Sequence, residues 1–190
     1  MFSIGRPTAR SIAAFIDAQS ESPLSYAPIG LSRKAYDGYN HDVLRQRVGR
    51  GERAFAAARA ALETWRAFPR GWIQVFPADA PVTPDTTVAV LAHHLGFWSL
   101  NACRVVERLG GSGSEFGFAY GTLAQHAESG EERFVVSLDP RDETVWYEIR
   151  ATSKPRAILA RLGHPVSRYF QERFRRESAL ALREAIGGGV

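Results

Sequence analysis

Residues 120–155 read YGTLAQHAESGEERFVVSLDPRDETVWYEIRATSKP, and this stretch decides the fold. In residues 132–138 and 144–152 apolar and polar side chains alternate, which is typical of β-strands with one buried face. The DPRD sequence at 139–142 predicts a tight connection between them. An Arg-rich helical pattern follows over about residues 165–186. Antiparallel strands beside a long terminal helix predict an α+β fold.

The same patterns extend toward the N-terminus. Thr8 is a candidate N-cap for a short amphipathic helix, and residues 20–37 are rich in Ser, Pro, Gly and Tyr and predict irregular structure. We expect a helix at 52–66 and further strands at 43–48, 72–76, 87–94, 97–108 and 116–123. Such a sheet of about six to seven strands would leave one face in water unless it curled. We therefore expect it to wrap around the terminal helix and to leave a cavity between helix and sheet.

Length and composition indicate one globular domain. The 190 residues are 45% hydrophobic and 23% charged, which is ordinary for a soluble protein of this size. We expect a single domain over 1–190, with an N-terminal helix and irregular segment at 1–35 and the core at 36–190. No stretch has the length and apolarity of a membrane span or of a signal peptide, so we expect a cytoplasmic protein. A lone cysteine, Cys103, excludes an internal disulfide.

The C-terminal region is basic. Residues 154–190 carry eight basic and three acidic side chains, a balance that could attract anionic lipid, nucleic acid or an acidic partner. Arg and Glu are mixed along the helix, which favours a solvated helix face. We therefore do not expect nucleic acid as a partner, and the sequence leaves the oligomeric state open.

Alternation also assigns side chains to the inner face of the sheet. The side chains that we expect to line the cavity are those of Trp98, Arg104, Phe118, Tyr120, Glu132, Phe134, Tyr147, Phe170 and Phe174. Two of these, Arg104 and Glu132, are charged residues in otherwise apolar rows. A buried charge needs a partner, so they either lie in water at strand ends, pair with each other, or form a polar spot in an apolar ligand pocket.

Three residues are candidates for catalysis: Tyr120, His126 and Glu132. His126 lies six residues before Glu132, across an expected turn at 127–130, and could act there as an acid–base group. The alternative, which we favour, is a turn histidine with local hydrogen bonds. His93 and His94 are adjacent on an expected strand and point to opposite faces, so they cannot share a metal ion. No metal-binding spacing occurs elsewhere, and we expect neither a metal nor a cofactor.

Several blocks of sequence in order resemble an uncharacterised family, number 1990 in the domain-of-unknown-function series. The blocks are GYNHD at 38–42, VGRG at 48–51, GW at 71–72, TVAV at 87–90, NACRVV at 101–106, FGFAYGTL at 116–123, His126, GEERF at 130–134, VWY at 145–147, and Ser153 with Pro155. The resemblance implies the START-like, birch-pollen-allergen-like helix-grip superfamily, whose members bind hydrophobic ligands. It agrees with the element order derived above.

Two functions follow from these expectations. The first is the binding of a hydrophobic small molecule or lipid in the cavity between the sheet and the terminal helix. The alternative is an enzyme of cyclase, aromatase or hydrolase type, which would use the acid–base residues in that cavity.

Overall fold

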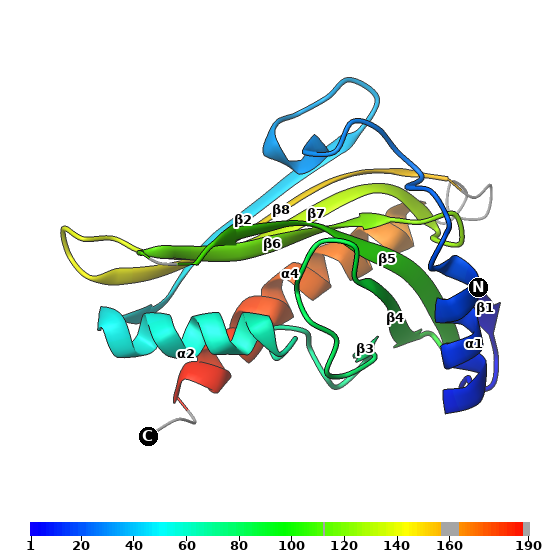
Figure 1. Ribbon diagram of the computed structural model, residues 1–190, viewed down its shortest axis with the longest axis horizontal. Coiled ribbons are helices and arrows are strands. Elements are labelled where there is room, and N and C mark those ends of the chain that lie inside the picture. Colours follow the sequence, from blue (N-terminus) through cyan, green and yellow to red (C-terminus); the bar gives the residue numbers. More distant parts are fainter. Residues whose placement is uncertain (112, 157–163, 188–190) are drawn as a thin grey trace.

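A computed structural model describes residues 1–111, 113–156 and 164–187 of the chain. Its elements are β1 (Phe2–Ser3), α1 (Ala9–Gln19), the 3-10 helix η1 (Leu31–Arg33), β2 (Asn40–Arg50), α2 (Gly51–Glu63), β3 (Ile73–Phe76), β4 (Thr87–His94), β5 (Phe97–Gly110), β6 (Glu115–Thr122), β7 (Glu128–Leu138), β8 (Thr144–Pro155) and α4 (His164–Gly187). Seven strands form one antiparallel path, β2-β8-β7-β6-β5-β4-β3, and β1 adds to β5. Helices α2 and α4 lie on one side of this sheet (Figure 1). The predicted α+β architecture, a curled antiparallel sheet around a long C-terminal helix, is confirmed.

Strand β7 is longer than its alternation predicted. Residues 128–130, expected as a turn, pair in register with residues 153–155 of β8, so that expectation was wrong. Gly130 allows this close pairing, because a Cβ there would lie 2.1 Å from the carbonyl oxygen of Thr152. The extension places His126 two residues before the start of β7.

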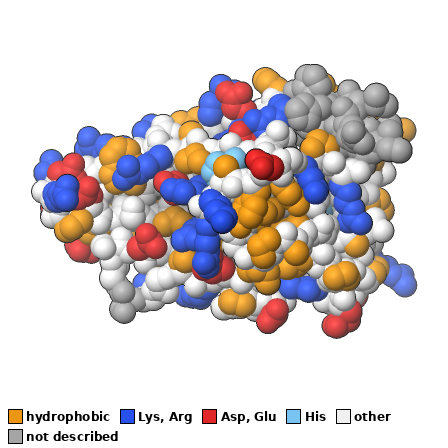
Figure 2. All heavy atoms as spheres, turned by 90° about the horizontal axis from the view of Figure 1, so that it is seen from above, with side chains coloured by type: hydrophobic (Ala, Val, Ile, Leu, Met, Phe, Trp, Pro, Cys, Tyr) orange, Lys and Arg blue, Asp and Glu red, His pale blue; other side chains and the backbone are white. Residues whose placement is uncertain are grey.

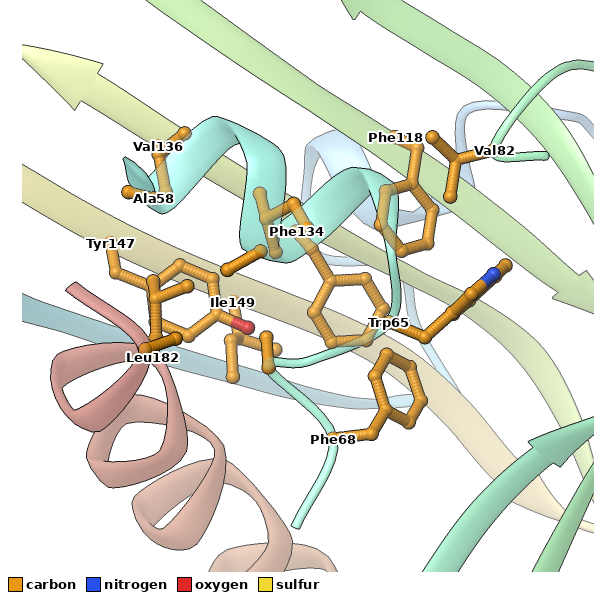
Figure 3. Close-up of a cluster of buried hydrophobic side chains, with 14 of the residues drawn as sticks. Ala58, Trp65, Phe68, Val82, Phe118, Phe134, Val136, Tyr147, Ile149 and Leu182 are labelled. Atoms are coloured by element: carbon orange, nitrogen blue, oxygen red, sulfur yellow. The ribbon is translucent and has the colours of Figure 1, made fainter. Parts of the chain in front are cut away.

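One half of the space between sheet and helices is filled by a solid core (Figure 3). Helix α2, at the place where the sequence predicted a helix, buries a stripe that includes Phe55 and Leu62. After α2 the chain turns at Trp65, whose indole nitrogen donates to the carbonyl oxygen of Ala80 at 2.7 Å. The Trp65 and Phe118 rings meet edge to face at 5.0 Å, and Phe118 stacks on Phe134 at 5.1 Å. These aromatic contacts pack the centre of this half tightly.

The second half of α4 packs directly onto that core. Its inward residues are small or buried there, with Ser178, Ala179 and Leu182 all fully buried. The Tyr147 hydroxyl and the Ser178 hydroxyl form a buried hydrogen bond of 2.8 Å. The first half of the helix instead presents the bulky Phe170 and Phe174, as the sequence predicted, and both of these line a pocket.

The outer face of the sheet is covered as well. Helix α1 packs over β4 and β5, where Ile12, Leu91 and Leu100 are at most 3% exposed. Leu100 belongs to the same row as Trp98 and Arg104, so that row faces α1 and not α4. The expectation that it points into the cavity was wrong, because both faces of β5 are buried and apolarity does not distinguish them.

Residues 20–39, here called the outer segment, cover another part of this face, while the outward side chains of β2 such as Val43 stay exposed (Figure 1). Its Ser25 amide donates to the carbonyl oxygen of Thr122 at 2.9 Å, and Ser129 donates its hydroxyl to the carbonyl oxygen of Ser25 at 2.7 Å. Seen from above, this side of the molecule carries a central group of hydrophobic side chains with charged side chains around it (Figure 2). The outer segment therefore acts as a second layer on the sheet.

Candidate functional site

A pocket of about 210 Å³ lies between the first half of α4 and the end of the sheet opposite the solid core. Its wall is mostly apolar and aromatic, with Trp72, Val90, Tyr120, Phe170 and Phe174 among its residues. Polar residues interrupt the wall, and they include His94, Asn101, His126, Glu128, Glu132 and Arg175. A mostly apolar hollow with a small number of polar groups is the usual composition of a ligand site.

Tyr120 and Glu132 form the central polar pair of the pocket. They stand opposite each other on β6 and β7, and the Tyr120 hydroxyl donates to Oε2 of Glu132 at 2.7 Å. Burial raises the pKa of the Glu132 carboxyl to about 7. Burial, and next the neighbouring Glu132 charge, raise the pKa of Tyr120 well above its ordinary value. Tyr120 therefore stays a donor, while Glu132 exchanges a proton near neutral pH.

Asp42 on β2 holds two arginines of α4 beside this pair. Its carboxylate accepts bidentate hydrogen bonds from Arg168, at 2.5 and 2.6 Å. The same carboxylate lies 3.4 Å from Nη1 of Arg175. Burial opposes ionisation of Asp42, but the hydrogen bond from Arg168 and the charges of both arginines prevail and lower its pKa. The arginines that approach the pocket are thus already bound to a carboxylate.

His126 makes its hydrogen bonds locally. The Glu128 backbone N–H donates to its Nδ1 at 2.9 Å, so the neutral ring carries its proton on Nε2. Burial lowers the pKa of His126 to about 4, which keeps the ring neutral at pH 7. Glu128 receives a hydrogen bond of 3.3 Å from the Ser153 hydroxyl, and burial raises its pKa. The local role expected of a turn histidine is confirmed, and the ring also lines the pocket.

The two adjacent histidines of β4 separate as the sequence predicted. His94 lines the pocket with its ring 4.6 Å from that of Phe170, and burial lowers its pKa. His93 lies on the outer face, where its ring stacks on Trp98 at 4.3 Å. Within the described ranges, no group of three His, Cys, Asp or Glu side chains is arranged to hold a metal ion.

The structure divides the predicted cavity residues into three groups. Tyr120, His126, Glu132, Phe170 and Phe174 line the pocket. Phe118, Phe134 and Tyr147 lie in the solid core next to it. Trp98 and Arg104 are on the other face of the sheet.

Arg104 does not pair with Glu132, contrary to one expectation from the sequence. Its guanidinium donates to the carbonyl oxygen of Ser20 at 2.5 Å and to that of Gln19 at 3.5 Å, and so fixes the end of α1. The pocket residues that sequence reasoning missed include Trp72, His94 and Arg175, together with Asp42 behind them. Arg168 and Arg175 are two helical turns apart on one face of α4, and this spacing was the available sign of a shared partner.

Comparisons with known proteins identify the family of this chain. A family model described as a domain of unknown function, DUF1990, matches residues 25–181. A UPF0548 protein of Dictyostelium discoideum is 31% identical over 208 residues, covering 98% of this chain and 96% of the relative. A UPF0548 protein of Deinococcus radiodurans is 33% identical over 204 residues, covering 98% of this chain and all of the relative.

Among solved structures, that of Ara h 8.0201 superposes with a TM-score of 0.53 at 13% identity, covering 80% of this chain and 99% of that one. This likeness shows the fold, which is the helix grip. Across the described residues, the helices are too short or too polar to cross a membrane. The family match spans most of the chain and includes both strands of the Tyr120–Glu132 pair, and the chain therefore belongs to the DUF1990 family, as its sequence blocks predicted.

Proposed function

We propose that this protein binds a small hydrophobic molecule in the pocket beneath the first half of α4. The observation that carries the proposal is a mostly apolar, aromatic wall that contains the hydrogen-bonded polar pair Tyr120 and Glu132. The volume of about 210 Å³ is below the range of about 300–1,000 Å³ that holds drug-sized ligands. It favours a compact molecule over a lipid with long acyl chains.

The test combines detection of a bound molecule with closure of the pocket. Ala151 stands beside Glu132 in the sheet and lines the pocket, so Ala151→Phe fills it. Val43→Phe adds the same ring at an exposed position and serves as the matched control. Native mass spectrometry of wild type and of the control should show a small co-purified molecule, or uptake from a library of small hydrophobic compounds, that Ala151→Phe lacks. Equal binding by all three proteins would refute this site.

A second function, acid–base catalysis on the bound molecule, is favoured by the carboxyl of Glu132. A group with a pKa of about 7 exchanges protons readily at neutral pH, which suits a cyclase, aromatase or hydrolase. Glu132→Gln should then retain the ligand that native mass spectrometry identifies but stop its conversion. Unchanged conversion by this variant would rule out Glu132 as the acid–base group.

We also propose that residues 1–190 act as one domain, since α1 and the outer segment both cover the sheet that forms the pocket wall. The cytoplasm stays our predicted location.

A further inference from the structure

We propose that the ligand is a small hydrophobic amine, whose protonated nitrogen binds the carboxylate of Glu132. The proposal rests on the proposed binding function and specifies its chemical class. It follows from the charges around the pocket, from the free side of the Glu132 carboxylate, and from the aromatic wall.

The basic side chains beside the pocket already have acidic partners. Arg168 and Arg175 both bind Asp42. Arg173 binds Glu177 at 2.7 Å, and its guanidinium also lies 4.9 Å from the centre of the Trp72 ring. Among the described residues, an anionic ligand would therefore have to break an existing ion pair to reach Arg168, Arg173 or Arg175.

The carboxylates of Glu132 and Glu128, which face the pocket, differ from these arginines because they form no ion pair with a described residue. Within the described residues, no ion pair includes Glu132 or Glu128, whose hydrogen bonds come from the uncharged hydroxyls of Tyr120 and Ser153. The Tyr120 bond occupies Oε2 of Glu132, and no donor from the described residues reaches Oε1. A largely buried carboxylate that no cation contacts directly is unfavourable, and a charged donor on the ligand would relieve this.

The aromatic wall supports the same class of ligand. Tyr120 and Phe174 line the pocket beside Glu132, and Phe170 lies farther along α4. The faces of such rings attract cations, and their bodies accept the apolar part of the molecule. Trp72 contributes less, because Arg173 already lies over its ring. A carboxylate among aromatic rings thus recognises an ammonium group with an apolar substituent.

The test compares three ligands with one skeleton: 3-phenylpropylamine, 3-phenylpropan-1-ol and 3-phenylpropanoate. Isothermal titration at pH 8 should show the amine binding at least about tenfold more tightly than the alcohol, and the acid more weakly still. Affinity for the amine should rise between pH 6 and pH 8, as Glu132 loses its proton while the amine keeps its own. The alcohol should show no such rise.

Glu132→Gln should remove the preference for the amine, whereas Glu172→Gln, which neutralises an exposed carboxylate on α4, should preserve it. If Glu132→Gln does not fold, the pH profile of the wild type decides. Alcohol or acid bound as tightly as the amine would overturn the amine proposal and leave a hydrophobic pocket standing. Failure of all three ligands to compete with the molecule seen by native mass spectrometry would overturn the amine class. Absence of any bound molecule would overturn the pocket proposal itself.

Discussion

The carboxyl groups of Glu131 and Glu132 lie on opposite faces of β7, although the two residues are neighbours in the chain. Glu131 accepts four hydrogen bonds from the outer segment: from the Tyr26 hydroxyl at 2.7 Å, the Gly30 amide at 2.9 Å, and the Ser32 amide and hydroxyl at 3.1 and 2.5 Å. Glu132 accepts one, from Tyr120. One carboxylate is thus saturated and holds two layers together, and the other lines the pocket with one hydrogen bond from the described residues.

Glu131→Ala should destabilise the protein by about 3 kcal/mol, because it leaves four donors of the outer segment without their acceptor in a buried site. Urea denaturation followed by circular dichroism measures the loss. The matched control is Glu172→Ala, whose exposed carboxylate should contribute at most about 0.5 kcal/mol. Equal stability of the two variants would show that the outer segment does not depend on Glu131.

Glu132 and His126 should act on stability with opposite pH dependence. Burial raises the pKa of Glu132 from 4.5 to about 7, so the folded state binds more protons than the unfolded state between these values. The contribution of Glu132 to the free energy of unfolding therefore falls as pH rises from about 4.5 to 7. Burial lowers the pKa of His126 from 6.5 to about 4, so its contribution instead falls as pH drops from about 6.5 to 4.

Each substitution should remove the pH dependence that the substituted residue contributes to stability. Relative to wild type, Glu132→Gln should gain stability as pH rises from 5 to 7.5, by up to about 3 kcal/mol. His126→Asn should gain, relative to wild type, as pH falls from 6.5 to 4.5. Urea denaturation at a series of pH values checks both. Parallel profiles for wild type and either variant would mean that the substituted residue titrates alike in the folded and unfolded states.

Asp42→Asn should destabilise the fold by about 3 kcal/mol, because Arg175 is buried and would lose its anion. It should also lower the pKa of Glu132, since the Asp42 charge raises that pKa and the Arg175 charge lowers it. The ¹³C shift of the Glu132 carboxyl, followed against pH by NMR, measures this. Glu172→Gln is the control that should leave the Glu132 pKa in place. The same pKa in wild type and Asp42→Asn would show that the two carboxylates are uncoupled.

A double-mutant cycle on the free energy of unfolding should measure a coupling energy between Tyr147 and Ser178. Ser178→Ala leaves the buried Tyr147 hydroxyl without a partner and should cost about 1–3 kcal/mol. Tyr147→Phe combined with Ser178→Ala should cost less than Ser178→Ala alone, because neither polar group then remains unpaired. Chemical denaturation of the four proteins gives the coupling energy. Strictly additive losses would contradict a direct bond.

Alternation predicted the inner faces of β6, β7 and β8 from the sequence, because one row on each strand is clearly the more apolar or aromatic. It failed on β5, where Leu100 and Cys103 lie on opposite faces and are both fully buried. Only the position of α1 shows which row lies on the outer face. The periodicity of a helix shows its apolar side but not the part of the sheet on which that side packs. For this reason Trp98 and Arg104 were predicted on the inner face of the sheet, whereas they lie on its outer face.

The outer segment could be recognised as irregular but not as a layer on the sheet. The sequence did contain one indication of this layer. On β6 the small residues Gly117, Ala119 and Gly121 form the row opposite the aromatic row, and they leave space for a segment to pack on that face. A Cβ on Gly121 would lie 2.2 Å from the Tyr26 hydroxyl, so the glycine is needed where the outer segment approaches. The Asp42–Arg168 pair was beyond sequence reasoning, because 126 positions separate the two residues.

Helix α4 has two halves with different tasks: the second half, with small inward residues, packs on the core, and the first half, with bulky inward residues, lines the pocket. The contacts that hold the helix to the core, such as that between Ser178 and Tyr147, lie apart from Phe170 and Gln171 at the pocket. Substitutions at the latter positions can therefore change the size and shape of the pocket while the anchoring half keeps the helix in place. A few positions in one helical turn are thus free to vary the pocket without loss of the fold.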